Sequence, residues 1–148
     1  MSKYTPVVKA VCISKAKGTV KKTVPEIYLK EGYGIEGDAH AGEGNRQVSL
    51  LAEESVNKLC DKIPDIDAGV FAENILTRGI CLHELIAGTT LRIGDVLMEV
   101  TQIGKECHND GCAIKQQIGD CVMPREGIFA HVLKGGIIKP GDKIEVEV

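Results

Sequence analysis

The pattern of apolar and polar positions along this chain predicts more strand than helix. Apolar or alternating runs bounded by turn-forming residues are typical of strands, and they occur at residues 6–14, 23–29 and 47–51. Pro25 lies within the second run, where its missing backbone N–H favours an edge or the first position of a strand. The first third of the chain is therefore expected to contribute three short strands.

Two later segments share one form: an apolar stretch, a basic residue, a Gly-Asp turn and a second apolar stretch. They span Thr90–Leu97 and Ile137–Ile144, and their first residues are 47 positions apart. Each is expected to be an arm of a β-hairpin, because Gly-Asp favours a tight turn. Since the sequence between them is unlike, they predict two strand pairs of one barrel or sandwich and not a repeat array.

Helical spacing is confined to short segments. Residues 52–63 place apolar side chains at helical intervals after two glutamates, which suit the positive end of a helix dipole. Residues 128–133 are expected to form a short amphipathic helix that carries His131 as a structural residue. The prediction is thus a mainly β fold, a β-barrel with a few short α-helices, in a single domain spanning residues 1–148.

Composition and charge exclude several classes of partner. The net charge is −3, and the densest run of the scattered lysines is Lys15, Lys17, Lys21 and Lys22. This distribution gives no electrostatic footprint for nucleic acid or an anionic membrane. No apolar signal core begins the chain and no window approaches the ~18 apolar residues of a membrane span. A cytoplasmic protein with reduced cysteines is expected.

Candidate chemistry gathers in one cysteine-rich segment. Three of the six cysteines lie between Lys105 and Cys121, and Cys107 stands between Lys105 and His108. A neighbouring cation favours the thiolate, which is both a nucleophile and a soft metal ligand. Cys107 is therefore expected to be the most reactive thiol, acting as sulfur carrier or metal ligand. Cys112 and Cys121 fit either resolving thiols or packing residues.

The same segment offers a second interpretation. Cys107, His108, Cys112 and Cys121 are four possible zinc ligands, but their spacing lacks the paired knuckles of recognisable zinc sites. The remaining cysteines lie in apolar surroundings and are expected to be buried packing residues; they are Cys12, Cys60 and Cys81.

A glycine-rich loop is the candidate ligand-binding segment. Residues 31–44 contain five glycines in fourteen positions, which suits a backbone that approaches a ligand closely. Asp38, His40 and Arg46 are the polar groups such a loop could present, and arginine with backbone N–H groups suits a phosphate. Arg125 could add a second anion contact. Asn74 could hold a loop to a ligand or cap local backbone.

Six segments in one order carry a family resemblance. They are Gly34–Gly42, Arg46–Ser49, Phe71–Gly79, Leu91–Asp95, Gly104–His108 and Gly136–Asp142. This succession resembles the MOSC domain, named for the C-terminal part of molybdenum cofactor sulfurases, in the form of a small stand-alone member. Single motifs of this kind are weak, whereas six in order over nearly the whole chain are specific.

The resemblance implies a MOSC-type β-barrel that binds a molybdopterin-type cofactor or carries activated sulfur on a cysteine. In relatives similar to the mitochondrial amidoxime-reducing component, that cysteine ligates molybdenum and the protein reduces N-hydroxylated compounds. Cys107 occupies the position of the family's reactive cysteine, so it is the expected catalytic residue and molybdenum ligand. The expected cofactor-binding residues are Asp38, His40, Arg46, Asn74, Lys105 and Arg125.

These observations lead to one expected function and two alternatives. The expected function is handling of the molybdenum cofactor, with a small-molecule or pterin ligand and with molybdenum cofactor biosynthesis proteins or molybdoenzymes as partners. The first alternative is a non-catalytic module that binds or delivers molybdopterin. The second is a small zinc-stabilised protein.

Overall fold

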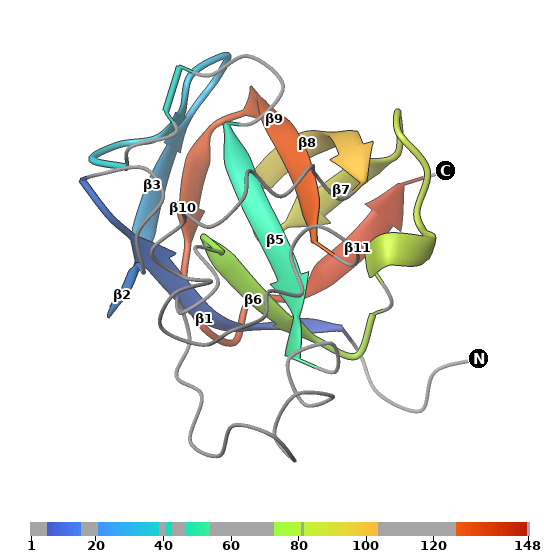
Figure 1. Ribbon diagram of the computed structural model, residues 1–148, viewed down its shortest axis with the longest axis horizontal. Helices are drawn as coiled ribbons and strands as arrows, with labels where there is room; N and C mark the ends of the chain where they lie inside the picture. Colours follow the sequence, from blue (N-terminus) through green and yellow to red (C-terminus); the bar gives the residue numbers. More distant parts are fainter. Residues whose placement is uncertain are drawn as a thin grey trace, which may run out of the picture.

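The computed structural model describes residues 6–15, 21–38, 41–42, 47–53, 73–80, 82–103 and 127–147. Most elements in these residues are strands, and one short 3-10 helix lies between β6 and β7 (Figure 1). The elements are β1 (Val7–Ile13), β2 (Lys22–Val24), β3 (Ile27–Lys30), β4 (Gly34–Ile35), β5 (Val48–Ala52), β6 (Ile75–Arg78), η2 (Leu82–Glu84), β7 (Thr90–Ile93), β8 (Val96–Ile103), β9 (Ile128–Lys134), β10 (Gly136–Ile138) and β11 (Ile144–Glu147). The prediction of a mainly β fold is confirmed.

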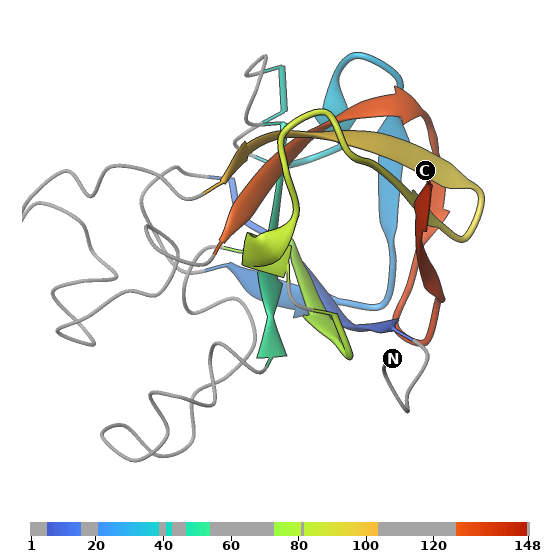
Figure 2. The ribbon, with the colours of Figure 1, turned by 90° about the vertical axis from the view of Figure 1, so that its right-hand side faces the viewer.

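The strands form two sheets that curve around a common interior (Figure 2). The larger sheet has eight strands in the order β11-β7-β8-β9-β5-β6-β1-β2, and the smaller has three in the order β10-β3-β4. All neighbouring strands are antiparallel except β5 and β6, which are parallel. The core between them is apolar, with Ile27, Ile35, Leu50, Ile75, Leu91, Ile93 and Met98 among its largest fully buried side chains.

The eight-stranded sheet is not a closed ring of paired strands. Backbone contacts nevertheless join residues 6–8, near the N-terminus, to residues 142–144, near the C-terminus. Ile144 donates its N–H to the Pro6 carbonyl at 2.9 Å, and Val8 donates to the Asp142 carbonyl at 2.9 Å. A single bridge pairs Val7 with Lys143. This seam joins the start of β1 to the start of β11 without a full ladder.

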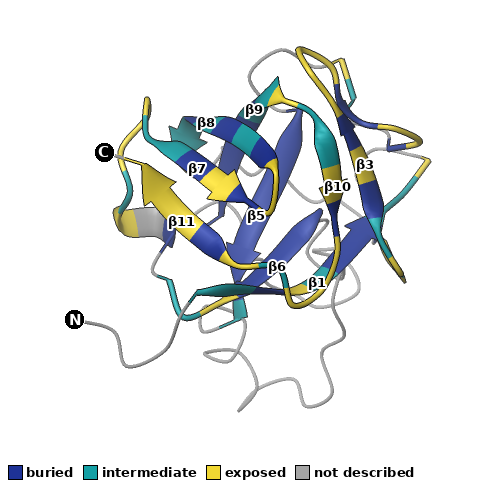
Figure 3. Ribbon diagram, turned by 180° about the vertical axis from the view of Figure 1, so that it is seen from behind, coloured by how far each residue is buried: buried dark blue, intermediate teal, exposed yellow. Residues whose placement is uncertain are grey.

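Burial differs sharply from strand to strand. All five residues of β5 are buried, and because successive strand residues face opposite sides, both faces of β5 are covered. In β11 only the first of four residues is buried. Figure 3 shows this contrast, with buried colour along β5 and β6 and exposed colour along β11. A parallel pair covered on both faces is the usual situation for parallel strands.

One predicted strand needs correction, and one predicted hairpin is confirmed. The single strand expected over residues 23–29 is two strands, β2 and β3, which separate at Pro25 and belong to different sheets. Proline cannot donate to a ladder, so the chain leaves one sheet there and enters the other. The segment Thr90–Leu97 is a true hairpin, since β7 and β8 pair through a turn at Gly94 and Asp95.

The expected second hairpin arm is wrong as a pair, because β10 pairs with β3 whereas β11 pairs with β7. Its turn is nevertheless present: Asp142 accepts from the Lys139 N–H through Oδ2 at 3.0 Å, and its own N–H donates to the Lys139 carbonyl at 3.2 Å. Pro140 inside this turn supplies no N–H for a ladder, so the two strands diverge instead of pairing.

The two helix predictions have different outcomes. Residues 128–133 belong to strand β9, between β8 and β5, so the amphipathic helix is wrong. A short apolar run buried on both faces fits helix and strand equally by pattern, and tertiary pairing decides. The helix predicted for residues 52–63 lies almost wholly outside the described residues. Within the described part, no helix is long and apolar enough to cross a membrane.

Candidate functional site

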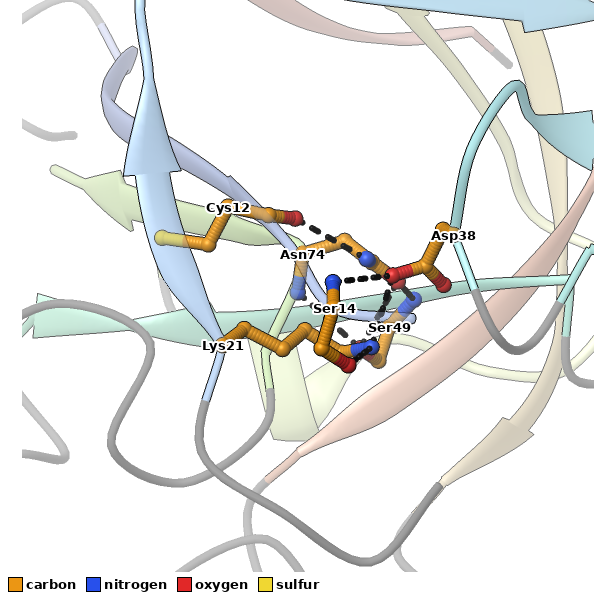
Figure 4. A network of polar contacts seen from close by, with 6 residues as sticks. All are labelled: Cys12, Ser14, Lys21, Asp38, Ser49 and Asn74. Carbon is orange, nitrogen blue, oxygen red and sulfur yellow. Dashed lines mark hydrogen bonds and ion pairs between the residues drawn. The ribbon is translucent and has the colours of Figure 1, made fainter. Parts of the chain in front are cut away.

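Buried polar side chains mark the candidate site. Those in the described part are Lys21, Asp38, Gln47, Ser49, Glu73, Asn74 and Thr77. Burial of a polar group is unfavourable in free energy unless the group gains a hydrogen-bond partner. Such a set therefore needs a structural or functional reason. Most of these buried polar side chains belong to two neighbouring groups of residues at the end of β1 (Figure 4).

The first group, here called the ion-pair cluster, consists of Ser14, Lys21 and Asp38. Lys21 Nζ lies 2.8 Å from Asp38 Oδ1, and both side chains are fully buried. The same Oδ1 accepts the Ser14 backbone N–H at 3.1 Å, and Lys21 Nζ donates to Ser14 Oγ at 3.2 Å. Each charge therefore has an opposite charge and a hydrogen bond, which a buried ion pair requires in order to persist.

Asp38 also fixes the backbone of the glycine-rich loop. Its N–H donates to the Ile35 carbonyl at 3.2 Å, and its carbonyl accepts from Ala41 at 3.2 Å. Gly34 packs against Gln47 so closely that an added Cβ would lie 3.0 Å from the Gln47 carbonyl oxygen, and its φ of +123° also favours glycine. The loop is thus held at a defined place.

Gln47 gives the loop a second attachment. Its Nε2 donates to the Gly32 carbonyl at 3.1 Å, while its Oε1 accepts the Val132 N–H at 3.0 Å. The loop is therefore connected to β9 through one buried amide and to β1 through the Asp38 carboxylate. Local sequence did not reveal the role of Gln47, because its partners are 15 and 85 positions away.

The second group, here called the Asn74 clamp, consists of Cys12, Ser49 and Asn74. Asn74 Oδ1 accepts from Ser49 N at 3.0 Å and Ser49 Oγ at 3.1 Å, and Nδ2 donates to the Cys12 carbonyl at 3.0 Å. One amide thereby ties β1 and β5 together beside the start of β6. These partners lie 25 and 62 positions away, so the amide bridges distant strands and does not cap local backbone; the cofactor-binding role expected for Asn74 remains a prediction.

Cys12 is a buried thiol, which agrees with the packing role predicted for it. Burial raises the pKa of this thiol from 9.0 to about 12; the negative charge of Glu73 adds to the rise and the positive charge of Lys21 opposes it. Figure 4 shows its carbonyl directed toward Asn74 and its sulfur directed away. A neutral buried thiol of this kind is a poor nucleophile and a poor metal ligand.

The structure describes two of the seven predicted site residues, Asp38 and Asn74, and it places both at the end of β1. Cys107, His40, Arg46, Lys105 and Arg125 lie outside the described residues, as do the zinc candidates His108, Cys112 and Cys121. Among the described side chains, no group of three or more His, Cys, Asp or Glu residues could hold a metal ion. The roles expected for the residues outside the described part remain predictions.

Sequence reasoning missed Lys21, Ser14 and Ser49. Lys21 belongs to the densest lysine run of the chain, and such a run is usually a solvated surface. Its burial depends on Asp38, which is 17 positions away, so no local pattern signals it. Ser49 lay within a family-like segment, but nothing in that segment indicated a bond with Asn74, 25 positions later.

The fold and the site together define a mainly β domain in which buried polar clusters anchor a glycine-rich loop. A family model, the MOSC domain, matches residues 37–145, which is well over half of the chain. The chain belongs to the MOSC domain family. That family is associated with molybdenum cofactor-related proteins. No curated protein sequence matches the chain.

Solved structures share the fold. The chain is similar to the YuaD protein from Bacillus subtilis, with a TM-score of 0.79 and 22% identity over 99% of this chain and 98% of that one. It is also similar to YiiM from Geobacillus stearothermophilus, with a TM-score of 0.74 and 20% identity over 97% and 75% of the two chains. YiiM from Escherichia coli gives a TM-score of 0.64 and 21% identity over 96% and 70%.

Proposed function

We propose that this protein binds a molybdopterin-type cofactor and carries activated sulfur, or molybdenum, on Cys107. Membership of the MOSC family supports a role in molybdenum cofactor handling. The observation that carries the proposal is the fixed glycine-rich loop, held by Asp38 to the end of β1 and by Gln47 to β9. Most of its described backbone N–H groups donate to protein carbonyls, so the loop contributes a fixed position to this proposal and the phosphate contacts come from side chains.

The described residues are compatible with such a ligand, and their role would be to support the site and not to contact the ligand. The Asp38 carboxylate and the Lys21 ammonium neutralise each other at 2.8 Å inside the protein, so they neither attract nor repel a phosphate strongly. Cys12, with its raised pKa, does not compete for a metal. The chemistry of this donor set is therefore compatible with a pterin site whose ligand contacts come from other residues.

The remaining roles follow from residue chemistry. Arg46 and Arg125 would bind the phosphate of the pterin through charge-assisted hydrogen bonds, and His40 would add a donor or acceptor from the same loop. Lys105 would favour the thiolate form of Cys107. Cys107 would hold molybdenum or a transferable sulfur atom. A bound molybdenum cofactor supplies a metal centre for transfer of an oxygen or sulfur atom.

Analysis of the purified, unreduced protein tests the proposal. We expect a fluorescent pterin after oxidative release, molybdenum by metal analysis, or an intact mass raised by one sulfur atom that reducing agent removes. Cys107→Ser should abolish the sulfur adduct and the molybdenum, and the matched variant Cys112→Ser should keep both. Zinc in stoichiometric amount, with no pterin, molybdenum or adduct, would overturn the proposal in favour of a zinc-stabilised protein.

Arg46→Ala tests the phosphate contact. We expect binding of a phosphate-bearing pterin to weaken by roughly 1.5–3 kcal/mol, the range for a lost hydrogen bond to a charged group, with little change in the free energy of unfolding. Titration of the pterin and denaturant unfolding measure the two quantities separately. Unchanged affinity with lowered stability would show that Arg46 is structural.

A further inference from the structure

We propose that Lys21 and Asp38 are positioning residues that lock the glycine-rich loop against both ends of the β1–β2 connection. The inference deepens the proposed function, on which its ligand-binding part rests. Neither residue was identified as a loop anchor by sequence, and Lys21 was assigned no role at all. Their side chains are fully buried, so they act on a ligand through the loop and not by contact with it.

The geometry of one oxygen atom carries the inference. Asp38 Oδ1 accepts from the Ser14 N–H at 3.1 Å and from Lys21 Nζ at 2.8 Å. Ser14 directly follows β1 and Lys21 directly precedes β2. A single carboxylate in the glycine-rich loop therefore binds the chain where it leaves one strand and where it enters the next. Three segments meet at that atom, and moving one of them breaks a charge-assisted hydrogen bond.

Stability alone does not explain a buried ion pair at this place. Desolvation of two charges costs about as much as their attraction returns, and neutral side chains of similar volume often stabilise a fold equally well. What an ion pair adds is a defined geometry, because the charges tolerate few arrangements in a low-dielectric interior. The ion pair here lies where a ligand loop meets two strand ends, so we attribute its presence to the position of that loop.

The decisive variant removes both charges and keeps the volume: Lys21→Met with Asp38→Asn. The single variant Lys21→Met leaves a buried carboxylate without its ammonium partner and should unfold far more readily than the double variant. The matched control is Arg92→Met with Glu147→Gln. It neutralises an exposed pair whose atoms are 2.7 Å apart, close to the 2.8 Å of the buried pair, in the paired strands β7 and β11.

Amide hydrogen exchange tests the lock without any ligand. In the native protein Asp38, Ala41 and Gly42 donate to carbonyls within the loop. In the double variant we expect these amides to exchange about tenfold faster or more, because local opening costs less, while Val100 in β8 keeps its rate. Unchanged exchange at all three loop amides would overturn the inference, whatever the protein binds.

Ligand binding tests the consequence. With molybdopterin released from a purified molybdoenzyme as the probe, we expect the dissociation constant of the double variant to rise about tenfold or more and that of the control to stay unchanged. The single variant Lys21→Arg should keep most of the wild-type affinity, because it retains a cation beside Asp38. Wild-type affinity in a double variant with loosened loop amides would show that the loop does not control binding. No binding by the wild-type protein would refute the proposed function and leave the exchange result to decide the lock.

Discussion

Two parts of the same eight-stranded sheet use polar residues in opposite ways. The site half consists of β1, β5 and β6, and the hairpin half consists of β7, β8 and β11. In the site half β5 is buried throughout and β6 is buried in three of four positions, and Ser49, Asn74 and Thr77 lie inside it. In the hairpin half buried positions alternate with partly or fully exposed ones along β7 and most of β8, and β11 is exposed after its first residue. Charged residues such as Arg92 and Glu147 pair at the surface.

The two halves therefore differ in how much a polar contact contributes to stability. A surface ion pair in the hairpin half competes with water and contributes little. A buried amide or carboxylate in the site half has no water to replace a lost partner, so each bond there is expensive to remove. The costly polar contacts lie beside the glycine-rich loop, to which the proposed function assigns the ligand.

Removal of the Asn74 clamp is expected to have the largest effect. Asn74→Ala leaves Ser49 N, Ser49 Oγ and the Cys12 carbonyl without their side-chain partner, at a cost of about 1–3 kcal/mol for each buried group. Denaturant unfolding should show a loss of about 3 kcal/mol or more. Thr101→Val, which removes one half-buried bond to the Phe129 carbonyl in β9, is the matched control and should lose about 1 kcal/mol. Equal losses would refute the contrast between the two halves.

The Cys12 thiol should make stability fall at high pH. Its pKa is about 12 in the fold and 9.0 as the ordinary value, so between these values the unfolded chain releases a proton that the native state keeps. Stability from this group is therefore complete below pH 9 and decreases as pH rises toward 12. The free energy of unfolding, measured at several pH values, should fall more steeply with pH in wild type than in Cys12→Ala over that window. Parallel curves would mean that Cys12 is not buried as described.

Thr77→Val is expected to raise stability modestly. Thr77 Oγ1 is the buried side-chain atom in the described part of the chain for which no hydrogen-bond partner is found. Valine has nearly the same shape and no hydroxyl to desolvate, so we expect a gain of about 1 kcal/mol in the free energy of unfolding. Thermal unfolding checks this directly. A loss of stability would indicate that the hydroxyl has a partner such as a buried water.

Arg92→Ala should have the smallest effect. The arginine side chain is half exposed and its pair with Glu147 lies at the sheet surface. We expect no resolvable change in the denaturation midpoint, and no difference between low and high salt, because exposed pairs are screened and entropically costly. A clear, salt-dependent destabilisation would place the hairpin half among the regions stabilised by charge.

Local pattern was sufficient for most of the fold. The runs at 6–14 and 47–51 are β1 and β5 within a residue or so, and the Thr90–Leu97 hairpin is present. It failed where pairing across the sheet decides: at 128–133, where β8 and β5 enclose β9, and after Pro140, where β10 and β11 choose different partners. The information for these choices lies in strands far away in the sequence.

The site was partly predictable for a similar reason. Glycine content and motif order identified the loop with Asp38 and the segment with Asn74. They did not identify Lys21, because a lysine is exposed by default and its burial requires a carboxylate brought in by another loop. Gln47 and Ser49 likewise show their roles through partners 15 to 85 positions away. Residue type therefore predicts a candidate, and tertiary contacts determine its role.

The seam between β1 and β11 has a consequence for how the chain acquires its fold. Pro6 and Val8 bind residues near the opposite end of the sequence, at Asp142 and Ile144. The entropic cost of closing a loop increases with the length of the loop. Folding therefore slows when such distant pairings must form. During synthesis the Val7–Val8 part of this edge has no partner until residues 142–144 leave the ribosome, whereas Val11–Ile13 can pair with β2 much earlier. We expect the seam to form last, so that a nascent chain shows this strand edge to chaperones for most of its elongation.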